Sequence, residues 1–101
     1  MRAASYKLQV IASATAQVAC PDKTVLLVDG DSSFNMTLND LGTIVENKLP
    51  IKIAIMNDFR QQMVVVWQEL FFDGRQTATK NVNPDFVQLA EVSEPQSSLL
   101  L

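Results

Sequence analysis

The hydrophobic pattern of the chain alternates between helical and strand-like segments. Apolar residues recur at helical spacings over residues 6–20, and small residues dominate the later half of that stretch, which predicts a closely packed helix. Two short apolar runs, residues 24–28 and 51–56, are typical of strands buried on both faces. Between them, Thr37 and Asp40 have the spacing of a capping box and predict that a second helix begins there. The face expected to be buried in the first helix contains Leu8, Ile11, Ala12, Thr15 and Ala19.

The remaining sequence predicts two more helices, which are separated by a polar loop over residues 73–83. The first has an apolar stripe at helical spacing that consists of Met63, Val64, Trp67, Leu70 and Phe71. Pro84 suits the first turn of the second, a short helix that carries Phe86 and Leu89. Residues 93–101 show no periodicity, so we expect an irregular tail whose three leucines are exposed.

This order of elements predicts an α/β fold. Because strands that alternate with helices pair in parallel, we expect a partial three-layer α/β/α domain with a short parallel sheet over residues 1–92. Two strands rarely make a stable sheet, since three or more are normally needed. An open sheet edge favours association. We therefore expect a protein partner to cover that edge.

Composition narrows the functions that the chain can have. Among its 101 residues the eight Lys and Arg are scattered and the net charge is −3, which does not favour binding to nucleic acid or to an anionic membrane. No apolar run is long enough to predict a membrane span. The chain has no His, which removes the commonest general base. Cys20 is the only cysteine, so it predicts a reducing compartment and a small buried side chain, with a reactive thiol as the alternative.

Candidate chemistry lies where the two predicted strands end. Residues 29–31 (Asp-Gly-Asp) follow the first strand and residues 57–58 (Asn-Asp) follow the second, and parallel sheets bind ligands beyond these carboxyl ends. Carboxylate, amide and carbonyl oxygens are ligands that suit Mg²⁺. Gly30 permits close backbone approach, and Ser32 and Ser33 are placed to hold a phosphate. An ordinary strand–turn–helix connection is the alternative.

Several motifs, in order, resemble one enzyme family. The segments "AQVACPD", "GDSSFNMTLNDL", "LPIKIAIMN", "QMVVVWQELFF" and "NPDFVQLAE" look like the thiamine-diphosphate-binding C-terminal domain of the large, catalytic subunit of acetolactate synthase. The resemblance spans about residues 11–92. It implies an enzyme that condenses two pyruvates, or pyruvate with 2-oxobutyrate, with loss of CO₂ in branched-chain amino-acid synthesis.

The resemblance also implies roles for individual residues. The Mg²⁺ ligands would be Asp31, Asp58 and the main-chain carbonyl of Arg60. Residues at the thiamine diphosphate, in addition to Asp31, would be Gly30, Ser32, Ser33, Met36, Asn57 and Met63. Trp67 would lie near the substrate entrance, although core packing is the alternative for Trp67 and for both methionines. No catalytic side chain is assigned within the chain.

Some features depart from the family pattern. The family has Asn-Asn where this chain has Asn57-Asp58, and it has glycine where this chain has Gln62. The family's catalytic glutamate and its FAD site lie in other domains, so we expect no FAD site and no turnover from these residues alone. The alternative is a degenerate fragment that acts as a structural or interaction subunit, or that has no independent role. The resemblance leaves the bacterial cytoplasm, plastids and mitochondria open as compartments.

Overall fold

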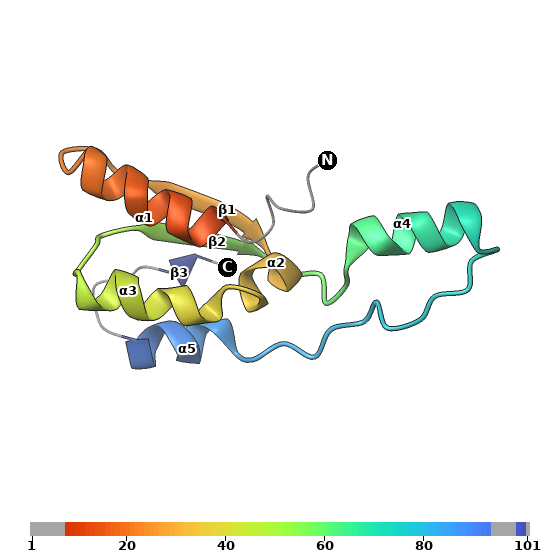
Figure 1. Cartoon of the computed structure of the whole chain (residues 1–101). Helices are drawn as coiled ribbons and strands as arrows, with labels where there is room; N and C mark the ends of the chain where they lie inside the picture. The colour runs from red at the N-terminus through yellow and green to blue at the C-terminus, as the bar shows by residue number, and fades with distance from the viewer. Residues whose placement is uncertain (1–7, 94–98, 101) are drawn as a thin grey trace.

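The fold is an α/β arrangement with a short parallel sheet, as the sequence predicts. It is seen in a computed structural model that describes residues 8–93 and 99–100 (Figure 1), so the predictions for residues 1–7, 94–98 and 101 lie outside the described residues. The described helices and strands are, in chain order, α1 (Gln9–Ala19), β1 (Leu26–Gly30), α2 (Asp31–Asn35), a 3-10 turn (Leu38–Asp40), α3 (Leu41–Glu46), β2 (Lys52–Met56), α4 (Gln62–Phe71), α5 (Phe86–Ser93) and β3 (Leu99–Leu100).

The sheet has the strand order β1-β2-β3 with parallel pairing throughout. Strands β1 and β2 pair in register from Leu26 opposite Lys52 to Gly30 opposite Met56. The two residues of β3 pair with Ile53 and Ala54, so the tail is not irregular throughout. A two-residue strand is held by backbone hydrogen bonds and is too short to show a side-chain period, which is why the sequence pattern does not predict it.

Only one face of the sheet is buried, which corrects the prediction of strands buried on both faces. Leu27 of β1 and Ile53 of β2 lie directly opposite each other and are buried. On the other face Leu26, Val28 and Met56 are each more than half exposed. Because side chains alternate along a strand, this pattern shows that the helices cover one face among the described residues.

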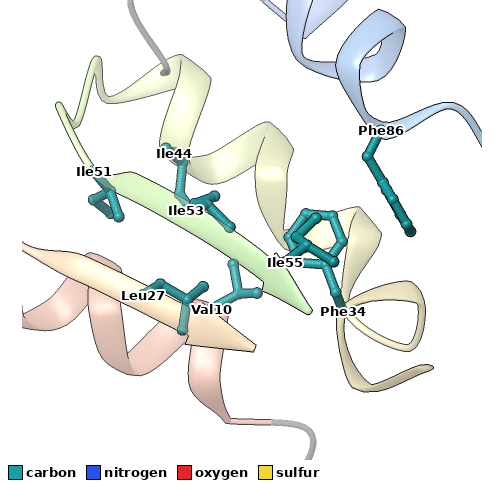
Figure 2. Close-up of a cluster of buried hydrophobic side chains, with 8 residues drawn as sticks. All are labelled: Val10, Leu27, Phe34, Ile44, Ile51, Ile53, Ile55 and Phe86. Carbon is teal, nitrogen blue, oxygen red and sulfur yellow. The ribbon is translucent and has the colours of Figure 1, made fainter. Parts of the chain in front are cut away.

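The core lies between that face and four helices (Figure 2). It consists of Val10, Leu27, Phe34, Ile44, Ile51, Ile53, Ile55 and Phe86. Helices α1, α2, α3 and α5 each contribute at least one of these side chains. Phe34 and Phe86 pack edge to face with ring centroids 5.7 Å apart. The described residues therefore supply two of the three expected layers, the sheet and one layer of helices.

The buried face of α1 is not the predicted one. Val10, Ser13 and Gln17 are buried, whereas Ile11 is 48% exposed. Both polar side chains donate to nearby carbonyls: the Ser13 hydroxyl to the Val10 carbonyl at 2.6 Å and the Gln17 amide nitrogen to the Lys23 carbonyl at 3.0 Å. Cys20, which follows the helix, is exposed, so its prediction as a buried residue is wrong.

The connection between β1 and α3 differs from the predicted capping box. Helix α2 begins at Asp31, directly after the strand, and α3 begins only at Leu41. Thr37 is buried, and its hydroxyl lies 3.4 Å from the Ser33 carbonyl and 3.3 Å from the Phe34 carbonyl. Thr37 therefore closes the end of α2 and does not cap the following helix.

Helix α4 forms as predicted, but its apolar stripe is exposed. It stands apart from the sheet at the end of two extended connections (Figure 1). Val65 is its buried residue, while the exposed large side chains on and next to it are Met63, Val64, Val66, Trp67, Leu70, Phe71 and Phe72. Despite this apolar surface, none of the helices in the part of the chain described above is long and apolar enough to cross a membrane.

Candidate functional site

A pocket of about 680 Å³ opens where β1 and β2 end. Its walls come from the ends of both strands, from α2 and from the first turn of α4. It brings together the predicted site residues Gly30, Asp31, Ser32, Ser33, Met36, Asp58, Arg60 and Met63. Asn57 is not in its lining. The volume lies within the range of about 300–1,000 Å³ that is common for small-molecule sites.

The passage from β1 into α2 leaves open space at Gly30. Its backbone is extended, with φ −82° and ψ 153°, so the glycine is not required by a left-handed conformation. A Cβ atom built on Gly30 would meet no heavy atom within 4 Å. The glycine therefore keeps this part of the pocket clear, which allows a ligand to approach the backbone.

Asp31 lies at the centre of a polar network. It is 2% exposed, and its Oδ2 accepts hydrogen bonds from the side-chain amides of Asn81 at 3.1 Å and Asn83 at 2.6 Å. The Asn83 amide also donates to Asn57 Oδ1 at 2.8 Å and accepts from Asn35 Nδ2 at 2.8 Å. Asn57 therefore reaches the site through Asn83, although it does not line the pocket.

The two other predicted cation ligands lie on the exposed connection from β2 to α4. Asp58 Oδ1 accepts from the Arg60 N–H at 3.1 Å, and the Arg60 carbonyl accepts from the Ser32 hydroxyl at 3.3 Å. Ser32 also accepts a hydrogen bond from the Asn81 amide. No group of three Asp, Glu, His or Cys side chains within the described ranges is suited to hold a metal. A cation here would need carbonyl, water or phosphate oxygens as well, which is the coordination that Mg²⁺ prefers.

The sequence predicts a polar loop over residues 73–83 and therefore does not identify Asn81 and Asn83 as site residues. Two backbone hydrogen bonds hold that loop against the connection from β2 to α4. The Asn81 N–H donates to the Phe59 carbonyl at 2.8 Å, and the Gln61 N–H donates to the Thr79 carbonyl at 2.9 Å. The motif "NPDFVQLAE" begins at Asn83 and was the signal that could have identified one of them.

Asp29 is a second buried carboxylate in the pocket wall. It is 4% exposed, and burial raises its pKa, although hydrogen bonds from the Ser33 hydroxyl and the Gly30 N–H lower it in part. With the Gln9 amide oriented so that its nitrogen faces the carboxylate, Nε2 donates to Asp29 Oδ2 at 2.9 Å. Gln9 also lines the pocket, so the first turn of α1 contributes a wall that the sequence pattern does not predict.

The pocket has an apolar side as well as a polar one. Met36 is 51% exposed and Met63 is 60% exposed, and both line it. Core packing, the alternative interpretation of these residues, is therefore wrong. It is also wrong for Trp67, which is 57% exposed on α4 and contacts Phe71 with ring centroids 5.2 Å apart.

The chain belongs to the thiamine pyrophosphate enzyme family and corresponds to its C-terminal TPP-binding domain. The family match covers residues 8–96, which include strands β1 and β2, the pocket and the asparagine network. The domain that the sequence motifs predict is therefore confirmed.

Proteins similar to this chain include acetolactate synthases and a decarboxylase. The chain is 50% identical over 76 residues to the mitochondrial acetolactate synthase catalytic subunit of Saccharomyces cerevisiae, covering 75% of this chain and 11% of that protein. It is 45% identical over 80 residues to the acetolactate synthase isozyme 2 large subunit of Escherichia coli, covering 78% of this chain and 15% of that protein. The thiamine diphosphate-dependent 4-hydroxybenzoylformate decarboxylase of Rhodococcus jostii RHA1 is similar in structure, with a TM-score of 0.77 and 28% identity over 86% of this chain and 16% of that one. The chain thus spans a small part of the length of each.

Proposed function

We propose that the chain is the thiamine-diphosphate- and Mg²⁺-binding segment of an acetolactate-synthase-like enzyme. The observation that carries this proposal is the pocket at the strand ends, which combines oxygen ligands on Asp31, Asp58 and Arg60 with an apolar side at Met36 and Met63. A diphosphate with its cation suits the polar side, and an organic ring suits the apolar side. Membership of the family and the similarity to acetolactate synthases support the same assignment.

Each residue has a simple physical role in this proposal. The carboxylates of Asp31 and Asp58 and the Arg60 carbonyl hold the cation, which in turn neutralises the diphosphate. Ser32 and Ser33 contact the diphosphate through backbone N–H groups in the first turn of α2, because their hydroxyls donate to the Arg60 carbonyl and to Asp29. When it is bound, thiamine diphosphate supplies the carbanion chemistry, and the protein contributes orientation and electrostatics. No catalytic side chain is assigned here and no FAD site is expected, so the isolated chain binds the cofactor without converting pyruvate.

The proposal is tested by calorimetric titration of thiamine diphosphate into the whole chain, with Mg²⁺ and then with EDTA. We expect binding that requires the metal. Asp31→Asn keeps the side-chain shape but removes the charge that holds the cation. This variant should lose most of its affinity for thiamine diphosphate, and the small remainder should be the same with Mg²⁺ and with EDTA. Asp40→Asn is the control, because Asp40 lies on the 3-10 turn and not in the pocket lining. A flat titration from a chain that circular dichroism shows to be folded would refute the proposal.

A structural or interaction subunit is a second candidate, with a protein partner covering the apolar surface. It is favoured by the exposed side chains of α4 and by the open sheet face, where Leu26 and Val28 are 56% and 51% exposed. Leu70, at 72% exposure, offers a test. Sedimentation velocity without cofactor should show a discrete complex that Leu70→Lys disrupts while the melting temperature stays unchanged. A monomer at all concentrations would count against association through α4.

A further inference from the structure

Asp31 has its two carboxylate oxygens in different environments. Both hydrogen bonds that the described residues make to this side chain end on Oδ2, one from Asn81 and one from Asn83. A carboxylate oxygen has two lone pairs, so these two amide donors saturate Oδ2. Oδ1 is the oxygen that remains for a cation. Since Asp31 is 2% exposed, the carboxylate has little freedom to exchange the two positions.

The two amides are themselves fixed in orientation. Asn83 Oδ1 accepts from Asn35 Nδ2 at 2.8 Å, which directs the Asn83 nitrogen toward Asp31. That nitrogen also donates to Asn57 Oδ1 at 2.8 Å. The Asn83 nitrogen thus donates to two of the predicted site residues, at Asp31 Oδ2 and Asn57 Oδ1. A flipped Asn83 amide would lose all three hydrogen bonds, so the network favours one orientation.

The same segment connects Asp31 to the other expected ligands. The Asn81 side chain donates to the Ser32 hydroxyl, and Ser32 donates to the Arg60 carbonyl. The Asn81 backbone N–H donates to the Phe59 carbonyl at 2.8 Å, next to Arg60 in the chain. Asn81 is therefore placed to set the spacing between the carboxylate of Asp31 and the carbonyl of Arg60.

We infer that Asn81 and Asn83 are positioning residues for the cation, because they hold Asp31 with Oδ1 turned toward it. This inference rests on the proposed function, which places a divalent cation at Asp31. Metal-binding carboxylates are commonly oriented by hydrogen bonds from outer residues, and loss of such a partner typically weakens metal binding by about 10- to 100-fold. We expect a weakening in that range for Asn83→Ala, and a smaller one for Asn81→Ala, whose contact with Asp31 is longer.

The test is a titration of the whole chain with Mn²⁺ alone, followed by the electron paramagnetic resonance signal of the free ion. Asn47→Ala is the matched control, because the Asn47 amide donates to the Thr43 carbonyl at 2.8 Å at the end of α3 and does not line the pocket. Thermal unfolding in EDTA is measured for each variant. A purely structural role would lower the melting temperature and leave Mn²⁺ affinity unchanged at a temperature where the variant is folded.

The outcomes separate this inference from the proposed function. Weaker Mn²⁺ binding in Asn83→Ala and Asn81→Ala, with Asn47→Ala like the wild type, supports the inference. Unchanged affinity overturns it alone, and tighter binding overturns it by showing that the amides compete with the ion. A wild-type chain that binds no Mn²⁺ also overturns it, whereas the proposed function is refuted only by the flat thiamine diphosphate titration described above. If Asn83→Ala does not fold, Asn81→Ala decides the result.

Discussion

The contact between Phe34 and Phe86 should hold together the two segments that build the site. The rings are 0% and 2% exposed, and they pack edge to face at 76°. Phe34 follows Asp31 by three residues, and Phe86 follows Asn83 by three. The aromatic pair therefore joins in the core the same two segments that the hydrogen bond between Asp31 and Asn83 joins in the site, and replacing Phe34 tests whether packing supports the polar network.

The expected magnitude follows from burial and ring geometry. Phe34→Ala at a fully buried position should cost about 3–5 kcal/mol in the free energy of unfolding. Phe34→Leu keeps much of the volume, so we expect about 1–2 kcal/mol, of which about 0.5–1.5 kcal/mol is the contact between the rings. A domain of this size is stable by about 5–15 kcal/mol, so the alanine variant loses a large part of its stability.

Urea denaturation of a double-mutant cycle measures the ring contact itself. Phe34→Leu, Phe86→Leu and the double variant should show a coupling energy of about 0.5–1.5 kcal/mol. Val82→Ala is the control, because Val82 is fully exposed and its replacement should change stability by less than about 0.5 kcal/mol. If the two leucine variants are additive, or if Phe34→Leu costs no more than Val82→Ala, the two rings are not packed as described.

Three further predictions concern single side chains. Because burial raises the pKa of Asp29, the folded chain binds this proton more tightly than the unfolded chain, so stability falls as pH rises through the interval between the ordinary and the raised pKa. Asp29→Asn should flatten that fall in urea titrations across the acidic range, and an unchanged slope would contradict the assignment. Asp85 Oδ1 accepts from the N–H groups of Val87 at 3.0 Å and Gln88 at 3.1 Å, so Asp85 caps the start of α5. Asp85→Ala should lower the free energy of unfolding by about 0.5–2 kcal/mol, and an unchanged urea midpoint would argue against this cap. Trp67 is 57% exposed, so iodide should quench its fluorescence readily, whereas strong protection would mean that α4 is covered in solution.

The elements with the strongest local signals were predictable from the sequence. The two apolar runs correctly predicted strands β1 and β2, and the helical periodicity of the second half correctly predicted helices α4 and α5. The pocket was predictable for a geometric reason. Parallel strands bring their carboxyl ends to one edge, so residues 29–31 and 57–58 had to come near each other once the strands paired in parallel.

The predictions that failed concern features that depend on contacts between side chains and backbone elsewhere in the chain. The side of α1 that is buried could not be chosen by hydrophobicity alone, because Ser13 and Gln17 face inward and each donates a hydrogen bond to a nearby backbone carbonyl. The role of Asn83 required a hydrogen bond to a residue that lies 52 positions earlier. A polar loop and a ligand-orienting loop have the same composition, so only the folded backbone distinguishes them.

The exposed stripe of α4 and the buried network around Asp31 lead to a common conclusion about the site. An apolar stripe specifies which side of a helix should be covered but not what covers it, and Leu70 and Phe71 are 72% and 66% exposed. Asp31, in contrast, obtains its hydrogen bonds from Asn81 and Asn83 of the same chain. A buried carboxylate without such partners would be costly, whereas an exposed apolar side chain is not. The polar centre can therefore form before any partner covers α4, and cation binding should depend on the asparagines more than on association.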